Sequence, residues 1–203
     1  MLEGILYVKG KTLEKIGDLI PKGKVTLIHG RSGCGKTLSI IKYMENQNVE
    51  PYFIDFDSND EYDDMKLTHI DGYKLIDKMK YDNSVIDAFK NQVVIVDTYA
   101  KAEQIMNSSN DIGDIHSFID ALIDRGNTVI AIAHTAYYSG KPAEPMVDAM
   151  FANHVACRLH LHNEVKQTKT SIYLEIEKLR GTDSKIIKNW MREPSILAQA
   201  KEM

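Results

Sequence analysis

The sequence predicts an α/β domain built around a mostly parallel β-sheet. Short apolar runs alternate with segments that are long enough to hold helices. Runs such as residues 93–97 and 128–133 are apolar almost throughout, which indicates strands covered on both faces, as in a parallel sheet. A glycine-rich motif lies between the apolar run 25–29 and a helical pattern, and it predicts a phosphate-binding turn.

The elements follow one another in a simple order. Five β-type runs are expected, over residues 25–29, 52–57, 93–97, 128–133 and 154–162. After residue 153 two more runs, 171–178 and 185–191, follow without long helices between them, which predicts a C-terminal antiparallel meander. Residues 106–113 and 137–146 are rich in turn formers, so we expect loops there.

Composition points to one soluble domain. The 203 residues are 43% hydrophobic, which is enough for a single core, so we expect one domain over residues 1–203. No apolar run approaches the length of a membrane span and the start lacks the pattern of a signal peptide, so no membrane partner is expected. The two cysteines, Cys34 and Cys157, form no disulfide framework, and we expect a cytoplasmic protein.

Charge is distributed unevenly along the chain. The formal net charge is −4, but residues 157–203 carry nine basic and six acidic side chains. Because a local basic groove is sufficient to bind nucleic acid, the acidic total does not exclude that function. An anionic partner is expected to meet the C-terminal quarter.

The strongest motif is a phosphate loop. Residues 30–37 match GxxxxGK[ST] after an apolar run and before a helical pattern. In such a loop backbone N–H groups surround phosphate oxygens, the lysine reaches the β and γ phosphates, and the hydroxyl ligates Mg²⁺. We expect Lys36 to act in catalysis, Thr37 to hold Mg²⁺, and Cys34 to contribute mainly its backbone. The residues expected to bind ATP are Gly30, Arg31, Ser32, Gly33, Cys34, Gly35, Lys36, Thr37 and Leu38.

Carboxylates follow two of the expected strands. Asp97 ends the run 93–97, and carboxyl ends of parallel strands face the ligand crevice of α/β sheets. Asp97 is therefore the expected second anchor of Mg²⁺, through water. Asp57 is the candidate for orienting or deprotonating the attacking water, with Asp55 and Glu61 as substitutes for that role. The alternative is a solvated acidic segment, since residues 55–64 are rich in carboxylates.

Histidines supply two further candidates. His134 follows the run 128–133, where a polar side chain can sense the γ-phosphate, although structural histidines are also common. His160 and His162 share a strand face near His154 and Cys157, but the spacing matches no usual zinc pattern. We therefore expect a sensor at His134 and no metal site among the other histidines.

Together these residues resemble the core of the RecA superfamily, which includes RecA-like recombinases and ring-shaped replicative helicases. The resemblance covers residues 15–192. In that family the carboxylate that activates water follows the strand after the phosphate-loop helix, which corresponds to Asp57. The strand after the Mg²⁺ aspartate ends in a polar γ-phosphate sensor, which corresponds to His134. The resemblance implies a RecA-like fold, with ATP and Mg²⁺ bound between the subunits of a homo-oligomeric ring or filament.

The resemblance also implies a pair of basic residues that acts on the neighbouring subunit. In the family a β-hairpin carries a Lys-x-Arg or Lys-x-Lys pair that reaches the neighbour's nucleotide. Residues 177–181, Glu-Lys-Leu-Arg-Gly, look like that motif. Lys178 and Arg180 are therefore expected to be catalytic in trans; the alternative is a solvated hairpin tip.

DNA contact is implied for two segments. In the family the DNA-binding loops follow the Mg²⁺ strand and the sensor strand, which here correspond to residues 101–114 and 136–150. The second segment contains Tyr137, Tyr138 and Lys141. Aromatic rings beside a cation suit single-stranded nucleic acid, so we expect these residues to bind single-stranded DNA.

The sequence departs from the family pattern in three ways. Asp57 stands where the family usually has Glu, His134 stands where recombinases commonly have Gln, and no additional terminal domain is evident. A chain limited to the core is most similar to the small RecA-like ATPases of bacteriophages that assist single-strand annealing recombination. That resemblance implies a location in the cytoplasm of a bacterial host.

The function implied is an ATP-dependent DNA recombination ATPase that assembles on single-stranded DNA, with a single-strand-binding protein as a further candidate partner. A hexameric replicative helicase motor is one alternative, and directional unwinding would distinguish it. A nucleotide-dependent assembly switch without DNA binding is another, and DNA-stimulated ATP hydrolysis would exclude it. A small-molecule kinase is disfavoured because residues 100–150 lack an arginine-rich lid.

Overall fold

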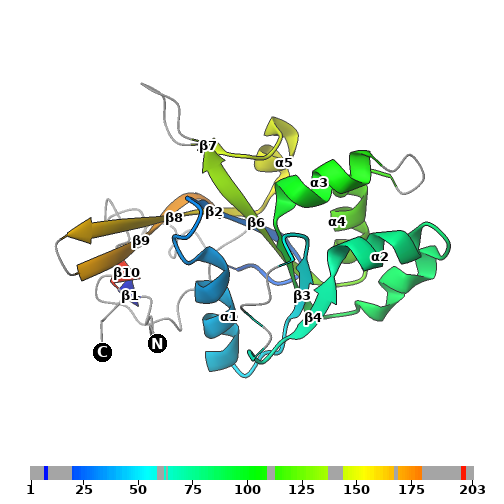
Figure 1. Cartoon of the computed structure of the whole chain (residues 1–203), viewed down its shortest axis with the longest axis horizontal. Helices are drawn as coiled ribbons and strands as arrows, with labels where there is room; N and C mark the ends of the chain where they lie inside the picture. Colours follow the sequence, from blue (N-terminus) through cyan, green and yellow to red (C-terminus); the bar gives the residue numbers. More distant parts are fainter. Residues whose placement is uncertain are drawn as a thin grey trace.

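The computed structural model describes residues 7–8, 20–58, 62, 64–108, 113–136, 144–166, 169–179 and 198–199. Seven strands of this part follow one another in the main sheet in the order β4-β3-β5-β6-β2-β8-β9 (Figure 1). Neighbours from β4 to β8 are parallel, whereas β9 is antiparallel to β8 and the short β7 is antiparallel to β6. The strands are β2 (Val25–Gly30), β3 (Tyr52–Asp55), β4 (Thr68–Asp71), β5 (Val93–Asp97), β6 (Thr128–Ala136), β7 (Glu144–Pro145), β8 (Cys157–Lys166) and β9 (Lys169–Leu179). The predicted α/β fold with a mostly parallel sheet is confirmed. A separate antiparallel pair joins β1 (Tyr7–Val8) to β10 (Ala198–Gln199).

Helices cover both faces of the sheet (Figure 1). Helix α1 packs against one face, and its buried residues share a cluster with the sheet residues of that side. The other helices pack on the opposite face, around a second and larger cluster. The helices are α1 (Lys36–Asn46), α2 (Gly72–Met79), the 3₁₀ helix η4 (Asn83–Ala88), α3 (Tyr99–Asn107), α4 (Ile115–Asp124) and α5 (Ala149–His154). Within the described residues, none of them is both long and apolar enough to span a bilayer.

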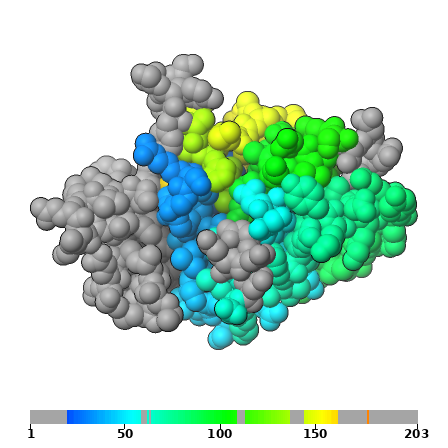
Figure 2. All heavy atoms as spheres, in the orientation of Figure 1, coloured from blue at the N-terminus to red at the C-terminus, as the bar shows by residue number. Residues whose placement is uncertain are grey.

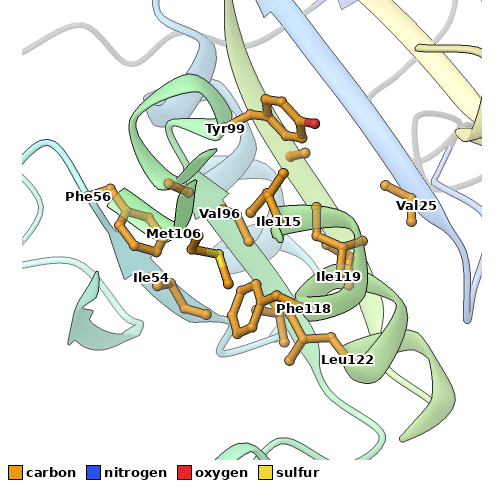
Figure 3. Close-up of a cluster of buried hydrophobic side chains, with 14 of the residues drawn as sticks. Val25, Ile54, Phe56, Val96, Tyr99, Met106, Ile115, Phe118, Ile119 and Leu122 are labelled. Atoms are coloured by element: carbon orange, nitrogen blue, oxygen red, sulfur yellow. The ribbon is translucent and has the colours of Figure 1, made fainter. Parts of the chain in front are cut away.

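The continuous apolar character of the central strands follows from this layering. In β5, Val94 and Val96 face the larger cluster while Ile95 faces the α1 side, and all three are fully buried. Figure 3 shows the larger cluster, in which Phe118 and Leu122 of α4 lie with residues of the strands and of α3. Each such buried side chain contributes about 1.5–3 kcal/mol to the free energy of unfolding.

Several strand bounds differ from the predicted ones. The strand predicted over 52–57 ends at Asp55, because the Asp55 carboxylate accepts a hydrogen bond from the Asp57 backbone N–H at 2.8 Å and the chain turns there. The strand predicted over 128–133 continues to residue 136, because β7 pairs with its end. The strand predicted over 154–162 begins only at residue 157, since α5 occupies the preceding segment.

Further comparisons with the predictions concern strand β4, the loop after α3 and the C-terminal strands. Strand β4 is not predicted by the sequence, because its residues are mostly exposed and polar at the sheet edge. The predicted loop over 106–113 begins later than expected, since α3 continues to Asn107. Strands β8 and β9 form the predicted antiparallel pair, whereas the predicted strand 185–191 lies outside the described residues.

Aspartates begin three of the helices. Asp71, Asp114 and Asp148 accept backbone hydrogen bonds from Lys74, Ser117 and Phe151, respectively, at 2.8–3.0 Å. Such caps satisfy N–H groups that have no partner within the helix. Asp148 also accepts hydrogen bonds from the buried Tyr99 hydroxyl at 2.6 Å and pairs with His116 at 2.8 Å. A single carboxylate thus links α3, α4 and the start of α5.

Substitution of Asn127 tests how much buried side-chain hydrogen bonds contribute to the stability of the fold. Its side chain is fully buried, donates to the carbonyls of Phe89 (2.9 Å) and Leu122 (2.8 Å), and accepts from the Gln92 N–H (2.9 Å). Asn127→Ala leaves these groups unpaired in the core, so we expect a loss of about 2–5 kcal/mol in the free energy of unfolding. Denaturant unfolding measures this loss, and Asn107→Ala, at an exposed position, is the control. Equal midpoints for the two variants would contradict the prediction.

Candidate nucleotide-binding site

The phosphate loop connects the buried strand β2 to helix α1. Gly33 and Gly35 have φ angles of +72° and +87°, which side chains rarely adopt, so the loop depends on glycine at both positions. Gly35 is the N-cap of α1, and no side chain caps the helix. The unpaired N–H groups of this helix end, together with its dipole, suit a phosphate group.

Gly30 is required by close packing. A Cβ atom placed there would lie 2.3 Å from the Leu161 carbonyl oxygen of β8 and 2.8 Å from the Cys34 sulfur. The backbone of the phosphate loop therefore approaches the neighbouring strand as closely as only glycine allows. Cys34 is buried against the same strand, with its thiol 3.6 Å from the Leu161 oxygen. The Cys34 side chain thus packs against β8, a contact that the sequence analysis did not predict.

Lys36 and Thr37 lie at the start of α1 and are both buried. The Lys36 ammonium donates hydrogen bonds to the carbonyl oxygens of Gly30 at 3.2 Å and Arg31 at 2.9 Å. Of the other residues predicted to bind ATP, Arg31, Ser32 and Gly33 are exposed, and Gly35 and Leu38 are half-buried.

Strand register brings the predicted residues to one edge of the sheet. Asp55 of β3 is paired with Asp97 of β5, and Gly30 of β2 is paired with His134 of β6. Because these strands are parallel, their carboxyl ends meet at the same edge, where α/β sheets bind ligands. In Figure 2 the blue atoms of the loop and α1 lie beside the cyan atoms that follow β3 and the yellow-green atoms of the end of β6.

The best-defined contact of the site joins Thr37 to Asp97. The Thr37 hydroxyl donates a hydrogen bond to the Asp97 carboxylate at 2.6 Å, and both side chains are buried. Burial raises the pKa of Asp97 to about 6; the Thr37 hydrogen bond opposes this rise, and the charge of Asp57 adds to it. A hydroxyl beside a buried, destabilised carboxylate is a set of oxygen donors that suits Mg²⁺. The residues thus fit the predicted metal.

Asp57 lies at the opening of this edge. Its side chain is exposed, and the Thr98 hydroxyl lies 3.5 Å from its carboxylate. Asp55 is buried instead, because it accepts the Asp57 N–H and also contacts His69 at 3.2 Å. Of the two carboxylates, Asp57 is therefore available to solvent, whereas Asp55 shapes the turn that presents it. His69 and Thr98 belong to no sequence motif, so only the structure identifies their contacts.

His134 is half-buried in β6. Burial lowers its pKa, the positive charge of Lys36 lowers it further, and the negative charge of Asp57 opposes these effects. Its Nδ1 atom is buried and, within the part of the chain that the structure describes, has no hydrogen-bond partner. A neutral imidazole with an unused nitrogen is suited to respond to a ligand at this edge.

Some predicted residues cannot be placed. Tyr137, Tyr138, Lys141 and Arg180 lie outside the described residues, as does Glu61. Lys178 lies on β9, directly after Glu177, and only its backbone position is described.

In the structure His160 contacts residues outside the group of side chains that was considered above for zinc. His160 stacks on His29, with ring centroids 4.3 Å apart, and both histidines contact Glu177. The sequence analysis assigned no role to His29 or to the Glu177 side chain, and their proximity depends on strand pairing that the sequence pattern does not reveal.

Comparisons with known proteins bear on the fold. A scan against protein-family models and a search of curated proteins give no match. Among the solved structures that match is a KaiC-like protein from the hyperthermophilic archaeon Pyrococcus horikoshii OT3. Its TM-score is 0.51 at 18% identity, over 80% of this chain and 82% of that chain. The chain has a RecA-like fold. At this identity the similarity establishes the RecA-like fold alone, and the predicted bacteriophage subgroup stays a prediction.

The buried Asp97 carboxylate predicts a conflict between stability and function. Its pKa is raised from 3.8 to about 6, so the folded protein holds its ionised form at a cost of up to about 3 kcal/mol at pH 7. Asp97→Asn is therefore expected to increase the free energy of unfolding of the ligand-free protein at pH 7. Because protonation of Asp97 relieves the same cost in the wild type, the difference should shrink as pH falls from 7 toward 5.

Denaturant unfolding at several pH values measures this effect. Asp77→Asn, at an exposed position on α2, is the control and should change stability by less than about 0.5 kcal/mol. A destabilised Asp97→Asn protein at pH 7 would show that the carboxylate is held in its ionised form by favourable contacts.

Proposed function

We propose that this protein is an ATPase that binds ATP and Mg²⁺ at the carboxyl edge of its sheet and hydrolyses ATP between the subunits of an assembly on single-stranded DNA. The observation that carries the ATPase part is the Thr37–Asp97 hydrogen bond of 2.6 Å beside the phosphate loop. It joins the hydroxyl of the loop to the carboxylate at the end of β5, the two groups that a phosphate-loop enzyme uses to hold Mg²⁺.

Each residue has a distinct role in this proposal. Lys36 leaves its contacts with the loop carbonyls and binds the β and γ phosphates. Thr37 and Asp97 are the residues that would hold Mg²⁺, which would neutralise charge on the phosphates when bound. Asp57 orients and deprotonates the attacking water, since it is the exposed carboxylate of the edge. The unpaired Nδ1 of His134 senses the γ-phosphate.

Two basic residues complete the site from the neighbouring subunit. Lys178 follows Glu177 on β9, at the edge of the sheet, and Arg180 follows two residues later. In the proposed assembly both side chains enter the nucleotide site of the next copy and stabilise charge on the transferring γ-phosphoryl group. A cation supplied in this way accounts for a large share of the rate in other phosphate-loop enzymes.

The proposed DNA contact lies in the connection between β6 and β7. Strand β6 ends at Ala136, and β7 begins at Glu144 and pairs back with the end of β6. The intervening segment, which contains Tyr137, Tyr138 and Lys141, therefore starts three residues after the proposed sensor His134. Contact with DNA and contact with the γ-phosphate would be made by adjacent parts of one strand and its loop.

Substitution of Lys36 tests the ATPase proposal. Lys36→Ala is expected to lower ATP turnover by at least about 100-fold, because the charge that faces the transferring phosphoryl group is lost. The fold should persist, as judged by circular dichroism. Lys42→Ala removes a half-exposed lysine from the same helix and should leave turnover unchanged. Wild-type turnover in Lys36→Ala would refute the assignment of the site.

Joint substitution of Tyr137, Tyr138 and Lys141 by Ala tests the DNA proposal. Stacking on an aromatic ring contributes about 1–3 kcal/mol per base, so binding of a single-stranded oligonucleotide should weaken by at least about tenfold. The slope of log affinity against log salt should fall only by about 0.7, since one cation is lost.

Fluorescence anisotropy titration measures both quantities, with Tyr81→Ala as a control at a highly exposed aromatic residue. Unchanged affinity in the triple variant would place the DNA site elsewhere. Absence of DNA binding by the wild type would favour a nucleotide-dependent assembly switch.

A further inference from the structure

A buried polar cluster lies beside the proposed nucleotide site, and none of its side chains has yet been given a role there. We call it the Glu177 cluster; it consists of Glu177, His29, His160, Arg158 and Thr135. His29 Nε2 lies 2.9 Å from Glu177 Oε2, and His29 Nδ1 lies 2.9 Å from the Thr135 hydroxyl. Arg158 Nε lies 2.6 Å from the same Glu177 oxygen, and His160 Nδ1 lies 3.6 Å from Oε1. His29 and His160 are 0% and 2% exposed, so most of the cluster is shielded from water.

Charge fixes the direction of its hydrogen bonds. Burial opposes ionisation of Glu177, but hydrogen bonds from His160 and His29 and the charge of Arg158 outweigh it and hold the pKa of Glu177 below its usual range. Burial lowers the pKa of His29, although the Glu177 hydrogen bond opposes that fall. A neutral His29 beside an ionised carboxylate must carry its proton on Nε2. Its Nδ1 atom then accepts a hydrogen bond from the Thr135 hydroxyl.

The cluster joins four strands, and three of its residues lie next to residues with proposed roles. His29 directly precedes Gly30 of the phosphate loop, and Thr135 directly follows the sensor His134. Glu177 directly precedes Lys178 on β9. A continuous chain of contacts therefore runs from β6 through β2 to β9, and each of its ends is one residue from a group proposed to meet the nucleotide.

A metal site is the alternative for the same side chains. His29, His160 and Glu177 offer ligand atoms that all lie within 4.8 Å of one another. The positive charge of Arg158 is already bound to the carboxylate, however, and would repel a cation. The two imidazole rings are also stacked, with only 16° between their planes, so their nitrogens lie side by side and do not point at one centre. These features favour an ion-paired hydrogen-bond network.

We propose that Glu177 is a positioning residue that fixes the β8–β9 hairpin against β2 and thereby holds Lys178 and Arg180 in place for the nucleotide of the neighbouring subunit. This inference rests on the proposed function. The β8–β9 register shifts at the level of this ion pair: Arg158 pairs with Lys178 and Leu159 pairs with Ile176, so Glu177 lies in the bulge between two paired positions. Its side-chain contacts with His29 and Arg158 connect this bulge to β2 and β8.

The experiment begins with Glu177→Ala. It should lower ATP turnover by about 10- to 100-fold, the effect of a misplaced catalytic group, while ATP binding by the phosphate loop stays within about twofold of the wild type. Glu177→Gln keeps the shape of the side chain and an acceptor for His29, so it should fold and show a smaller loss. Asp87→Ala removes the partner of Arg125 on the surface and is the control.

Mixed assemblies then separate action on the neighbour from action on the protein's own loop. A Glu177→Ala protomer has an intact phosphate loop and a misplaced basic pair in this proposal. Mixing it with Lys36→Ala, which has an intact basic pair, should restore turnover. Mixing it with the Lys178→Ala, Arg180→Ala double variant should not, because no protomer then supplies a positioned pair.

Other outcomes overturn the inference. Restoration by the double variant alone would show that Glu177 acts on its own phosphate loop through His29, and restoration by both or by neither would also contradict the proposal. A rise in melting temperature with Zn²⁺ that His160→Ala abolishes would make the cluster a metal site. The mixture of Lys36→Ala with the double variant tests the shared site itself. If that mixture stays inactive although the two co-assemble, the subunit-interface part of the proposed function fails as well.

Discussion

Parallel pairing of β2 with both β6 and β8 is the constraint on which the rest of the structure depends. It places Gly30 opposite His134 on one side and opposite Leu161 on the other. The second pairing is so close that a Cβ atom at position 30 would lie 2.3 Å from the Leu161 oxygen. The start of the phosphate loop is thus fixed by the backbone of two neighbouring strands, and α1 leaves the sheet from a defined point. The positions of the other groups at the carboxyl edge depend on that point.

Several polar groups near this edge are held by hydrogen bonds to one another. Thr37 holds Asp97, Asp55 holds the turn before Asp57, and the Glu177 cluster holds the end of the sheet beyond β2. Buried polar groups are costly unless they are paired, so such contacts specify one arrangement more strongly than apolar packing does. Asp57, which is exposed, and the Nδ1 atom of His134, which has no hydrogen-bond partner among the described residues, are the two groups to which we assign contact with water and the γ-phosphate.

Much of this architecture could be predicted from the sequence, because its signals are local. The phosphate loop is a contiguous motif, and the run 93–97 is apolar on both faces because both faces are covered by helices. Strand β4 could not be predicted, since an edge strand with exposed polar residues has no apolar pattern. The start of β8 also differs from the predicted one. The residues before it form α5, which begins at the Asp148 cap.

The residues of the candidate site also divide into those that could be predicted from the sequence and those that could not. Lys36 and Thr37 begin α1, Asp97 ends β5, Asp57 follows β3 and His134 lies near the carboxyl end of β6. Their common edge could therefore be inferred from the topology of parallel sheets. The roles of His69 and Glu177 could not, because their partners are 14 and 148 residues away in sequence. Such contacts depend on which strands become neighbours, and that order is not encoded in any single segment.

The triple role of Asp148 has a mechanical consequence. Its carboxylate caps α5, binds the Tyr99 hydroxyl and pairs with His116, so a pull on the chain just before α5 loads all three bonds together. Tyr99 is the first residue of α3 and lies two positions after Asp97. The segment that connects β7 to α5 is therefore linked through one side chain to the residues that directly follow β5.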